Sequence, residues 1–322
     1  MKAYVYGANG AAITDVAKPA PKGTQVLVRV RACGLNRADL GMTKGHAHGS
    51  AGGAGTVLGM EWAGEIAEVG PEAKGVKIGD KVMGSGAAAF AEYTLADHGR
   101  LFRTPSNMNF EDAATLPVAL ATMHNAVVTN GALQPGQSVL IQGASSGVGL
   151  MALQIAKLKG ARIVIGSSTD ATRRGRLKEF GADLAVDSSD PGWVDQVLKA
   201  TNGEGVDLIV DQVSGKVASQ NLAATRIKGR IVNVGRLGGT HADFNFDLHA
   251  ARRINYIGVT FRTRSIEEIR EIFDEVRKDI WPAVESRKLQ LPIDKVFAFD
   301  DIGKAFEHME ANRHLGKIVV TL

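Results

Sequence analysis

Apolar and polar residues alternate with a period of two in the first third of the chain. The segments 25–31 and 64–70 show this alternation, and glycines bound the second of them. Alternating runs separated by glycine-containing turns predict an all-β unit. The stretch 45–55 consists mainly of Gly, Ala, His and Ser, which cannot build a core, so we expect it to form a loop.

A helical pattern interrupted by Pro117 covers 111–128, and from Ser138 onward continuous apolar runs alternate with further helical patterns. The expected strands lie at 139–141, 163–165, 184–186, 208–210 and 231–234. The expected helices between them lie at 148–159, 171–180 and 193–200. Apolar strands that alternate with helices are typical of a parallel sheet covered on both faces, so this region predicts a doubly wound α/β fold.

The last sixty or so residues do not continue this alternation. Ser265–Glu268 forms a capping-box pattern that predicts a helix toward Lys278, and 318–320 reads as a closing strand. The tail is therefore expected to return to the first unit. We predict a discontinuous β-rich domain, residues 1–117 and 263–322, into which a doubly wound domain, residues 118–262, is inserted.

The composition is that of an ordinary globular protein. Hydrophobic residues make up 44% of the 322 positions and charged residues 22%, which argues against disorder or a coiled coil. The net charge of +4 is not concentrated in a Lys/Arg block, so no nucleic-acid partner is indicated. The single cysteine, Cys33, excludes an intrachain disulfide and a Cys-rich zinc site. No signal pattern and no bilayer-length apolar run is present, so we expect a cytoplasmic protein without membrane contact.

The segment Gln142–Gly149 follows one expected strand and opens the next helix. Its small residues would let the backbone approach a pyrophosphate, and the helix N-terminus would supply N–H donors. The strict G-x-G-x-x-G pattern is not present, so the alternative is a tight strand–helix turn that binds nothing. The motif favours nucleotide binding.

The same turn matches the G-x-S-x-G pattern of the α/β-hydrolase nucleophile elbow. Ser145, Asp211 and His241 follow in the hydrolase order Ser, Asp, His. A hydrolase does not require a glycine at position 149, and it does not account for the β-rich first third of the chain. We therefore keep a serine hydrolase as an unfavoured alternative from another class.

The tip of the next expected strand carries hydroxyl groups in place of the acid that NAD enzymes use for the ribose. Ser167, Ser168 and Thr169 occupy the tip, and Arg173 and Arg174 follow in the next turn. Hydroxyl and guanidinium groups suit a 2′-phosphate, which predicts NADPH. In the alternative interpretation Asp170 begins the helix and the two arginines are merely solvated.

Several further segments match one family pattern in order along the chain. They are Ala32–Leu40, Leu58–Gly64, Gly79–Val82, Pro135–Ile141, Gly181–Asp183, Phe261–Arg264 and Gly316–Val319. Together with the glycine turn, these motifs resemble the medium-chain dehydrogenase/reductase superfamily, most closely its zinc-free, zeta-crystallin-like quinone oxidoreductase group. The resemblance covers essentially the whole chain. It implies a GroES-like catalytic domain, a Rossmann NADP(H)-binding domain and an active site in the cleft between them.

The resemblance also implies roles for individual residues. Asn36 and Thr122 are implied at the reacting end of the site. The residues implied for cofactor binding are Ser146, Gly147, Val148, Gly149, Ser167, Arg173, Val234, Gly235, Phe261 and Asn312. Asn36 would hydrogen-bond a substrate carbonyl, although a turn residue that ties loop backbone together is an equally good interpretation of it.

Zinc is not expected in this chain. The zinc alcohol dehydrogenases carry Cys and His ligands where this chain has Asn36 and Met60, and His46 and His48 lie on a glycine-rich loop that makes a weak site. Without a Lewis acid, reduction of a quinone or a conjugated carbonyl by NADPH is favoured over alcohol oxidation. A 2-alkenal or enoyl reductase and an alcohol dehydrogenase-like enzyme remain alternatives, because two tyrosines of the quinone reductases are replaced here.

The segment 255–261 carries apolar residues where the family's sheet has its edge strand. An exposed apolar edge favours pairing with another chain, and the family usually joins two sheets across a two-fold axis. We therefore expect a homodimer.

Overall fold

The computed structural model describes residues 1–49 and 52–322 and has an α/β fold. The chain divides into two compact units. Unit 1 comprises Met1–Ala121 and Phe261–Leu322, and unit 2 comprises Thr122–Thr260. The expected fold class, a GroES-like β-rich part combined with a Rossmann-type parallel sheet, is confirmed.

Unit 2 is built on a six-stranded sheet in which every neighbouring pair is parallel. In spatial order the strands are β11 (Leu184–Val186), β10 (Ile163–Ser167), β9 (Ser138–Gln142), β12 (Val206–Asp211), β13 (Thr225–Asn233) and β14 (Asn255–Gly258). The helices are α4 (Gly147–Leu158), α5 (Ala171–Arg176), α6 (Trp193–Ala200), α7 (Ala218–Ala224) and α8 (Phe246–Arg252). The strand order reverses beside β9, which is the position where doubly wound sheets bind their ligands.

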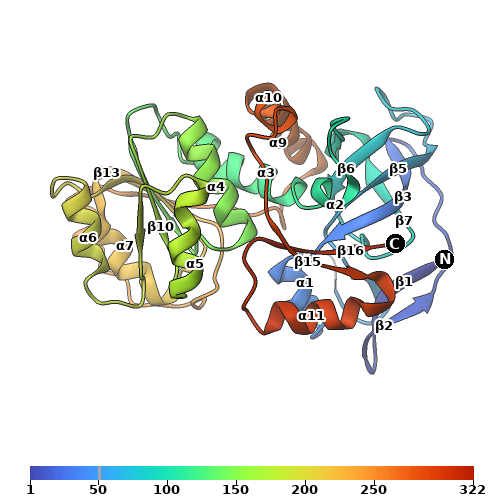
Figure 1. Ribbon diagram of the computed structural model, residues 1–322, viewed down its shortest axis with the longest axis horizontal. Helices are drawn as coiled ribbons and strands as arrows, with labels where there is room; N and C mark the ends of the chain where they lie inside the picture. The colour runs from blue at the N-terminus through green and yellow to red at the C-terminus, as the bar shows by residue number, and fades with distance from the viewer. Residues whose placement is uncertain (50–51) are drawn as a thin grey trace. The chain divides into compact units, whose positions relative to one another are not determined.

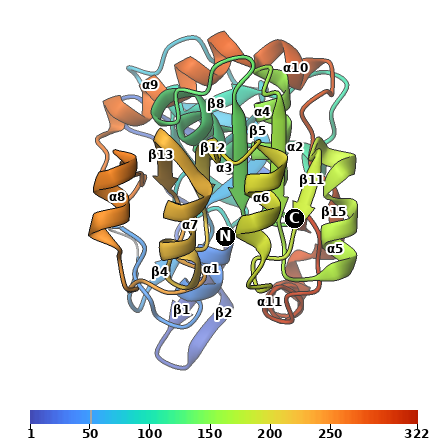
Figure 2. The same cartoon turned by 90° about the vertical axis from the view of Figure 1, so that its left-hand side faces the viewer.

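The continuous apolar runs become the central strands because helices cover both faces of the sheet. All five residues of β9 are buried, and Leu140, Ile165 and Ile209 pack in one core cluster with Trp193 of α6. α4 packs on β9 and β10, and α6 packs beside α7 (Figures 1 and 2). The carboxyl ends of β9, β10, β12 and β13 therefore lie in a row, with the glycine turn after β9.

Unit 1 combines two sheets. The larger one has the strand order β15–β16–β3–β5–β6–β8, with β7 also paired to β3, and the smaller one has the order β2–β1–β4. Its strands are β1 (Lys2–Gly7), β2 (Gly10–Asp15), β3 (Gln25–Gly34), β4 (Thr56–Val57), β5 (Glu61–Val69), β6 (Lys81–Ser85), β7 (Tyr93–Asp97), β8 (Leu101–Arg103), β15 (Ile293–Ala298) and β16 (Lys317–Thr321). Its helices are α1 (Arg37–Met42), α2 (Phe110–Ala113), α9 (Ile266–Asp279), α10 (Trp281–Glu285) and α11 (Ile302–Glu310).

The tail returns to unit 1 as the sequence predicts. β16 pairs antiparallel with β3, so that Val320 lies opposite Cys33. The capping box is also present at the start of α9: Ser265 Oγ accepts from Glu268 N at 3.2 Å, and Glu268 Oε2 accepts from Ser265 N at 2.8 Å. The pairing of β16 with β3 explains how residues far apart in the sequence form one β-rich unit.

Two helical expectations differ from the structure in detail. The helix expected at 171–180 ends at Arg176 and continues as a 3₁₀ turn, Leu177–Phe180. α3 (Pro117–His124) begins at the proline that interrupts the pattern, because a proline at the first helical position costs no hydrogen bond. It is followed by a π-helical turn, Asn125–Asn130, a rare conformation that is frequent at functional sites.

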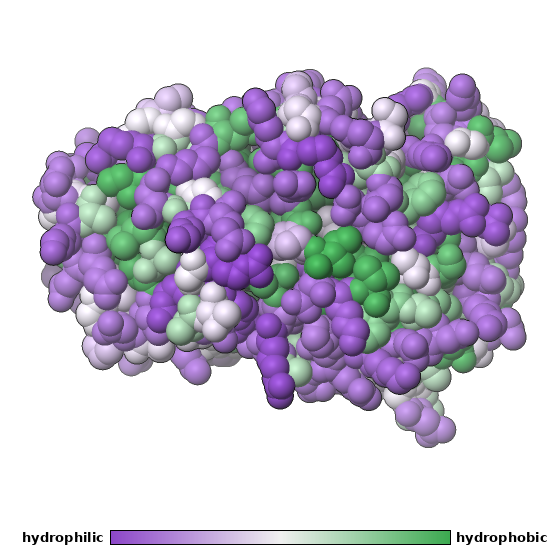
Figure 3. All heavy atoms as spheres, in the orientation of Figure 1, coloured by the Kyte–Doolittle hydropathy of each residue, from purple (hydrophilic) through white to green (hydrophobic). Residues whose placement is uncertain are grey.

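Polar and charged residues cover most of the face drawn in Figure 3. Within the described parts of the chain, no helix is both long enough and apolar enough to cross a membrane.

Candidate functional site

The glycine turn of unit 2 brings backbone unusually close to the first turn of α4. Gly143 has φ +73°, which favours glycine, and a Cβ on Gly149 would lie 2.6 Å from Gly143 O. Any larger residue at Gly149 would push the helix away from the turn. The two glycines therefore have a packing role that does not depend on a ligand.

Ser146 caps α4. Its Oγ accepts from Gly149 N at 3.1 Å and donates to Gln212 Oε1 at 3.0 Å, which ties the turn to the end of β12. The N–H groups of Gly147 and Val148, at the start of this helix, precede any acceptor within the helix. Together with the helix dipole they form an anion-binding end, which fits a pyrophosphate.

Ser167 has a different role from the expected one. Its side chain is 0% exposed, and its Oγ accepts from Gly143 N at 3.0 Å and donates to Gln142 Oε1 at 2.6 Å. The hydroxyl faces the interior of unit 2 because β10 carries it beside β9. The expectation that Ser167 holds a 2′-phosphate is corrected: this hydroxyl fixes the glycine turn.

Arg173 and Arg174 differ in how they are held. Arg174 Nη1 donates to Ser168 O at 2.8 Å and to Asp187 Oδ2 at 2.9 Å, so it ties β10 to the end of β11. Arg173 is half-buried, and its Nε lies 3.6 Å from Asp170 Oδ1. Arg174 thus links two strand ends, whereas Arg173 lies beside the start of its own helix.

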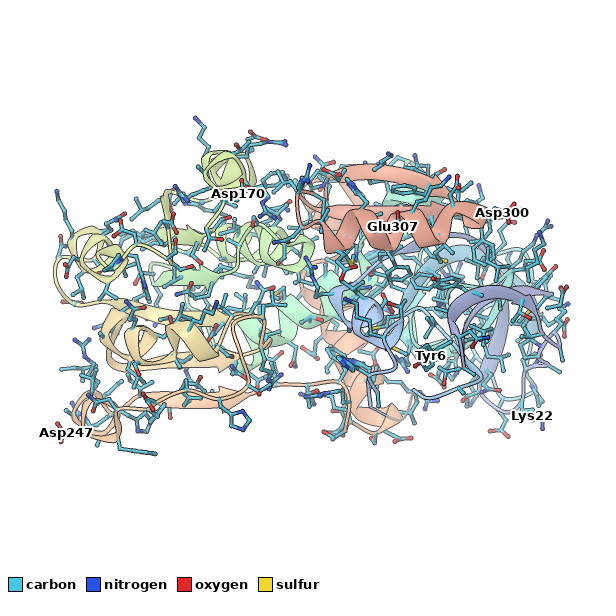
Figure 4. The ribbon with its side chains drawn as sticks, turned by 90° about the horizontal axis from the view of Figure 1, so that it is seen from below. Tyr6, Lys22, Asp170, Asp247, Asp300 and Glu307 are labelled. Carbon is cyan, nitrogen blue, oxygen red and sulfur yellow. The ribbon has the colours of Figure 1, made fainter. Side chains whose placement is uncertain are left out.

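Asp170, which is labelled in Figure 4, is the N-cap residue of α5. Its Oδ1 accepts from Arg173 N at 2.8 Å, and this bond lowers the pKa of the carboxyl. Asp170 therefore begins the helix, as the alternative interpretation expects, but Arg173 is half-buried and not fully solvated.

Val234 and Gly235 lie directly after β13. Their N–H groups donate to Asp211 O at 2.7 and 3.1 Å, and Gly235 O accepts from Ser214 Oγ at 2.6 Å. A Cβ on Gly235 would lie 2.6 Å from Gln212 O, so a close approach of backbone to backbone requires glycine here. This loop is thus rigidly joined to the end of β12.

The remaining residues implied by the resemblance lie as follows. Thr122 is half-buried on α3, Phe261 is half-buried at the start of the tail of unit 1, and Asn312 is exposed after α11. Asn312 has φ +53° and its Oδ1 accepts from Arg37 Nη2 at 2.9 Å. Their roles toward a cofactor stay predictions.

Asn36 precedes α1 in unit 1, and both ends of its amide are bonded. Its Oδ1 accepts from Lys317 Nζ at 3.0 Å, and its Nδ2 donates to Glu61 Oε1 at 3.0 Å. These bonds join the start of α1 to β16 and β5. They support the structural interpretation of Asn36.

A buried ion pair between Glu61 and Lys317 stands at the centre of this network, and sequence reasoning missed it. The two side chains are 0% and 4% exposed, and Lys317 Nζ donates to Glu61 Oε1. Glu61 Oε2 also accepts from Val118 N, in the first turn of α3, at 3.0 Å. Both residues belong to motifs that resemble the family, but a charge inside a motif gives no signal of its burial.

Asp39 is the second buried carboxyl beside Asn36. Its Oδ2 accepts from Asn36 N at 2.8 Å, while its Oδ1 has no hydrogen-bond partner. Burial raises the pKa of Asp39 to about 7, against the opposing effects of the Asn36 N–H and the charge of Lys317. Burial likewise raises the pKa of Glu61, and the neighbouring Lys317 opposes this.

The raised pKa of Asp39 predicts how stability depends on pH. The folded carboxyl keeps its proton up to about pH 7, whereas the unfolded one loses it near 3.8, so the stabilisation is present at low pH and is lost as the pH rises through about 7. The asparagine variant lacks this titration. We therefore expect the free energy of unfolding of Asp39→Asn, relative to that of the wild type, to be higher at about pH 8 than at about pH 5 by on the order of 2 kcal/mol. Urea unfolding at both pH values measures this, and an unchanged difference would contradict the buried, protonated state.

The hydrolase alternative is wrong, because its three residues are not assembled. Ser145 Oγ lies 3.0 Å from Ser168 Oγ, and His241 is exposed with its Nδ1 2.9 Å from Thr240 Oγ1. The Asp211 carboxylate is bonded to backbone N–H groups and to Asn221. A nucleophile, a base and an orienting acid must be within hydrogen-bond reach of one another.

No cluster of three or more His, Cys, Asp or Glu side chains suited to a metal ion occurs among residues 1–49 and 52–322. Cys33 is fully buried, its Sγ donates to Ala89 O at 2.9 Å, and burial raises the pKa of its thiol. Cys33 is therefore a core residue.

Two family patterns match successive segments of the chain. The pattern described as "Alcohol dehydrogenase GroES-like domain" matches residues 22–106, and that described as "Zinc-binding dehydrogenase" matches residues 147–278. Among solved structures, an alcohol dehydrogenase superfamily protein from Novosphingobium aromaticivorans is 30% identical, with a TM-score of 0.88 over 100% of this chain and 99% of that one. The CurK enoyl reductase is 25% identical, with a TM-score of 0.87 over 99% of both chains.

Curated relatives fall into two kinds. A large phenolphthiocerol/phthiocerol polyketide synthase protein of Mycobacterium tuberculosis is 30% identical over 312 residues, which are 96% of this chain but 14% of that protein. The chain thus spans about one seventh of the length of the polyketide synthase that it matches. The quinone oxidoreductase-like protein 2 of Bos taurus is 27% identical over 92% of this chain and 85% of its own length.

Proposed function

Since the chain belongs to the medium-chain dehydrogenase/reductase superfamily, we propose that it transfers hydride from NADPH to a quinone or another conjugated carbonyl compound without zinc. The family indicates an oxidoreductase with a nicotinamide cofactor. The observation that carries the finer proposal is the charge at the end of β10. There the carboxylate of Asp170 caps α5, and the half-buried Arg173 offers a cation for a 2′-phosphate.

The residues proposed to hold the cofactor are those of unit 2. The N–H groups of Gly147 and Val148 would receive the pyrophosphate, with Ser146 and Gly149 fixing the turn. Val234 and Gly235 would border the nicotinamide half, as would Thr122. When bound, the cofactor supplies the hydride, and the protein supplies orientation and a dry site.

The residues of unit 1 support the zinc-free part of the proposal. Asn36 and Met60 stand at the two positions where the zinc enzymes carry a thiolate and an imidazole, and neither side chain is a usual zinc ligand. The Asn36 amide is bonded to Lys317 and Glu61, so its oxygen already accepts a hydrogen bond from the Lys317 ammonium group. An alcohol would need a strong base or a Lewis acid to lose its proton, whereas a quinone or enone accepts hydride at carbon.

The relatives support two substrate classes. A quinone fits the quinone oxidoreductase-like relative, and an enoyl compound fits the CurK enoyl reductase. Both classes are conjugated acceptors, so the same hydride-transfer chemistry serves them. An enoyl reductase is the second candidate function.

A substrate panel tests the proposed function. We expect NADPH oxidation, followed by its absorbance, to be faster with 1,4-benzoquinone or an unsaturated ketone, aldehyde or thioester than NADP⁺ reduction with any simple alcohol. A metal chelator is expected to leave this rate unchanged. Alcohol oxidation that outpaces every conjugated acceptor, or activity that requires stoichiometric zinc, would overturn the proposal.

The edge of the parallel sheet supports a homodimer. β14 is the terminal strand of that sheet, its Tyr256 ring packs 5.8 Å from Phe244, and Phe246 is 76% exposed beside them. An unpaired edge with exposed aromatic rings favours pairing with a second copy. We expect light scattering at micromolar concentration to give the dimer mass, and Tyr256→Lys to shift it toward the monomer. A monomeric wild type would contradict this.

A further inference from the structure

A chain of hydrogen bonds crosses the carboxyl edge of the parallel sheet beneath the glycine turn. We propose that Gln142, Asn221 and Asp211 are positioning residues, which fix the glycine turn and the Val234–Gly235 loop in the arrangement that binds the cofactor. The inference rests on the proposed function, because it assigns these two segments to one nicotinamide dinucleotide. Asn221 and Asp211 lie outside the motifs that suggested the cofactor site, and Gln142 is the first residue of the glycine-turn motif.

The bonds form an unbroken series within unit 2. Gly143 N donates to Ser167 Oγ at 3.0 Å, and Ser167 Oγ donates to Gln142 Oε1 at 2.6 Å. Gln142 Nε2 donates to Asn221 Oδ1 at 2.8 Å, and Asn221 Nδ2 donates to Asp211 Oδ2 at 3.0 Å. All four side chains are 0% exposed, so water cannot replace a lost partner.

The Asp211 carboxylate sets the direction of the whole series. Burial raises the pKa of Asp211, and this is opposed by the Asn221 amide and by Ser214 N and Val213 N, which both donate to its Oδ1 at 2.8 Å. In its ionised form the carboxylate has no proton to donate. Asn221 must therefore turn its NH₂ toward Asp211 and its oxygen toward Gln142. Gln142 in turn offers its oxygen to Ser167. Hydrogen bonds that all point one way strengthen one another, and this polarity leaves Ser167 able to accept from Gly143.

Asp211 also holds the second segment. Its backbone oxygen accepts from Val234 N and Gly235 N, and Ser214, which its carboxylate binds, donates from Oγ to Gly235 O. One buried carboxylate thus connects the turn after β9 with the loop after β13, two strands away in the sheet. A cofactor that spans both segments requires them at a fixed separation, because misplacement of either one costs binding.

Asn221→Asp provides a selective test, because a protonated aspartic acid reproduces the asparagine pattern. Its carbonyl oxygen can accept from Gln142 and its O–H can donate to Asp211. The ionised form would place two carboxylates at hydrogen-bond distance, which disfavours ionisation of one of them. The other ionisable groups that act on Asp211 are Arg236, after β13, and Tyr256 of β14.

The experiment is calorimetric titration of the full chain with NADP⁺ at about pH 5 and about pH 8, on either side of the titration expected for a shared carboxyl proton. We expect Asn221→Asp to bind roughly tenfold more weakly than the wild type at the higher pH and nearly as tightly at the lower one. Asn221→Ala should be weakened by a similar factor at both. Thr201→Val is the matched control, because Thr201 is buried in the same unit and its hydroxyl bonds to Val197 O, Leu198 O and Gly205 N, outside the proposed series.

Hydrogen exchange of the peptide 139–149 without cofactor gives a readout that does not depend on binding. Each variant is compared with the wild type at the same pH, and faster exchange is expected for Asn221→Ala at both values and for Asn221→Asp at the higher one. Wild-type protein that fails to bind NADP⁺ would overturn the proposed function. If the wild type binds but both Asn221 variants keep wild-type affinity, or lose no more than Thr201→Val, the inference is overturned.

Discussion

Arg173→Ala is expected to weaken NADPH binding by roughly ten- to a hundredfold and to leave NADH binding almost unchanged. The reason is the loss of a charge-assisted contact to a 2′-phosphate that NADH does not carry. Arg173 is the half-buried arginine that follows the end of β10, and its guanidinium faces Asp170. Fluorescence titration with both cofactors measures the ratio of the two affinities.

Arg176→Ala serves as the matched control, because Arg176 is an arginine of the same helix that pairs with Glu179 at 2.9 Å. Its removal changes the net charge by the same amount, so a general electrostatic effect would appear in both variants. Equal affinity of the wild type for NADPH and NADH would contradict the assignment of NADPH. Equal losses in Arg173→Ala and Arg176→Ala would contradict the specific role of Arg173.

Lys317→Met is expected to destabilise the protein by about 3–5 kcal/mol. The substitution keeps an unbranched apolar side chain in place of the lysine stem but leaves the fully buried Glu61 carboxylate without its cation, and Asn36 Oδ1 loses its donor. Breaking a buried ion pair costs far more than removing it whole, because the remaining charge stays desolvated. Urea unfolding at neutral pH measures the change in the free energy of unfolding.

The double variant Glu61→Gln with Lys317→Met tests whether the unpaired Glu61 charge causes the loss of stability. It should recover a substantial part of the lost stability, since no uncompensated charge remains. Lys304→Met is the control for an exposed pair. Lys304 bonds Asp301 at 2.7 Å with side chains 70% and 47% exposed, so its loss should change the free energy of unfolding far less than Lys317→Met does. A small loss for Lys317→Met, comparable with that of Lys304→Met, would show that the ion pair does not stabilise unit 1.

Local patterns in the sequence were sufficient for much of unit 2. The apolar runs predict β9, β10, β11, β12 and the end of β13, because a strand covered on both faces needs apolar residues at every position. The glycine turn is likewise local. Position 143 requires glycine because its φ is positive, and position 149 requires glycine because a Cβ there would collide with the turn. The capping box at Ser265 depends on residues three apart and is found as expected.

The chain's own sequence thus determined the fold class, the return of the tail to the β-rich part and the position of the glycine turn after β9. Only the tertiary structure decided which polar side chains face inward. Ser167 follows the expected strand but is turned toward Gln142, Glu61 and Lys317 meet across 256 positions, and Gln142 and Asn221 meet across 79. Short-range periodicity reports the propensity of a segment, whereas these pairings depend on strand order and register, which are set when distant segments pack together. A buried charge or amide is stable only beside its partner, so its role cannot be assigned before that partner is in place.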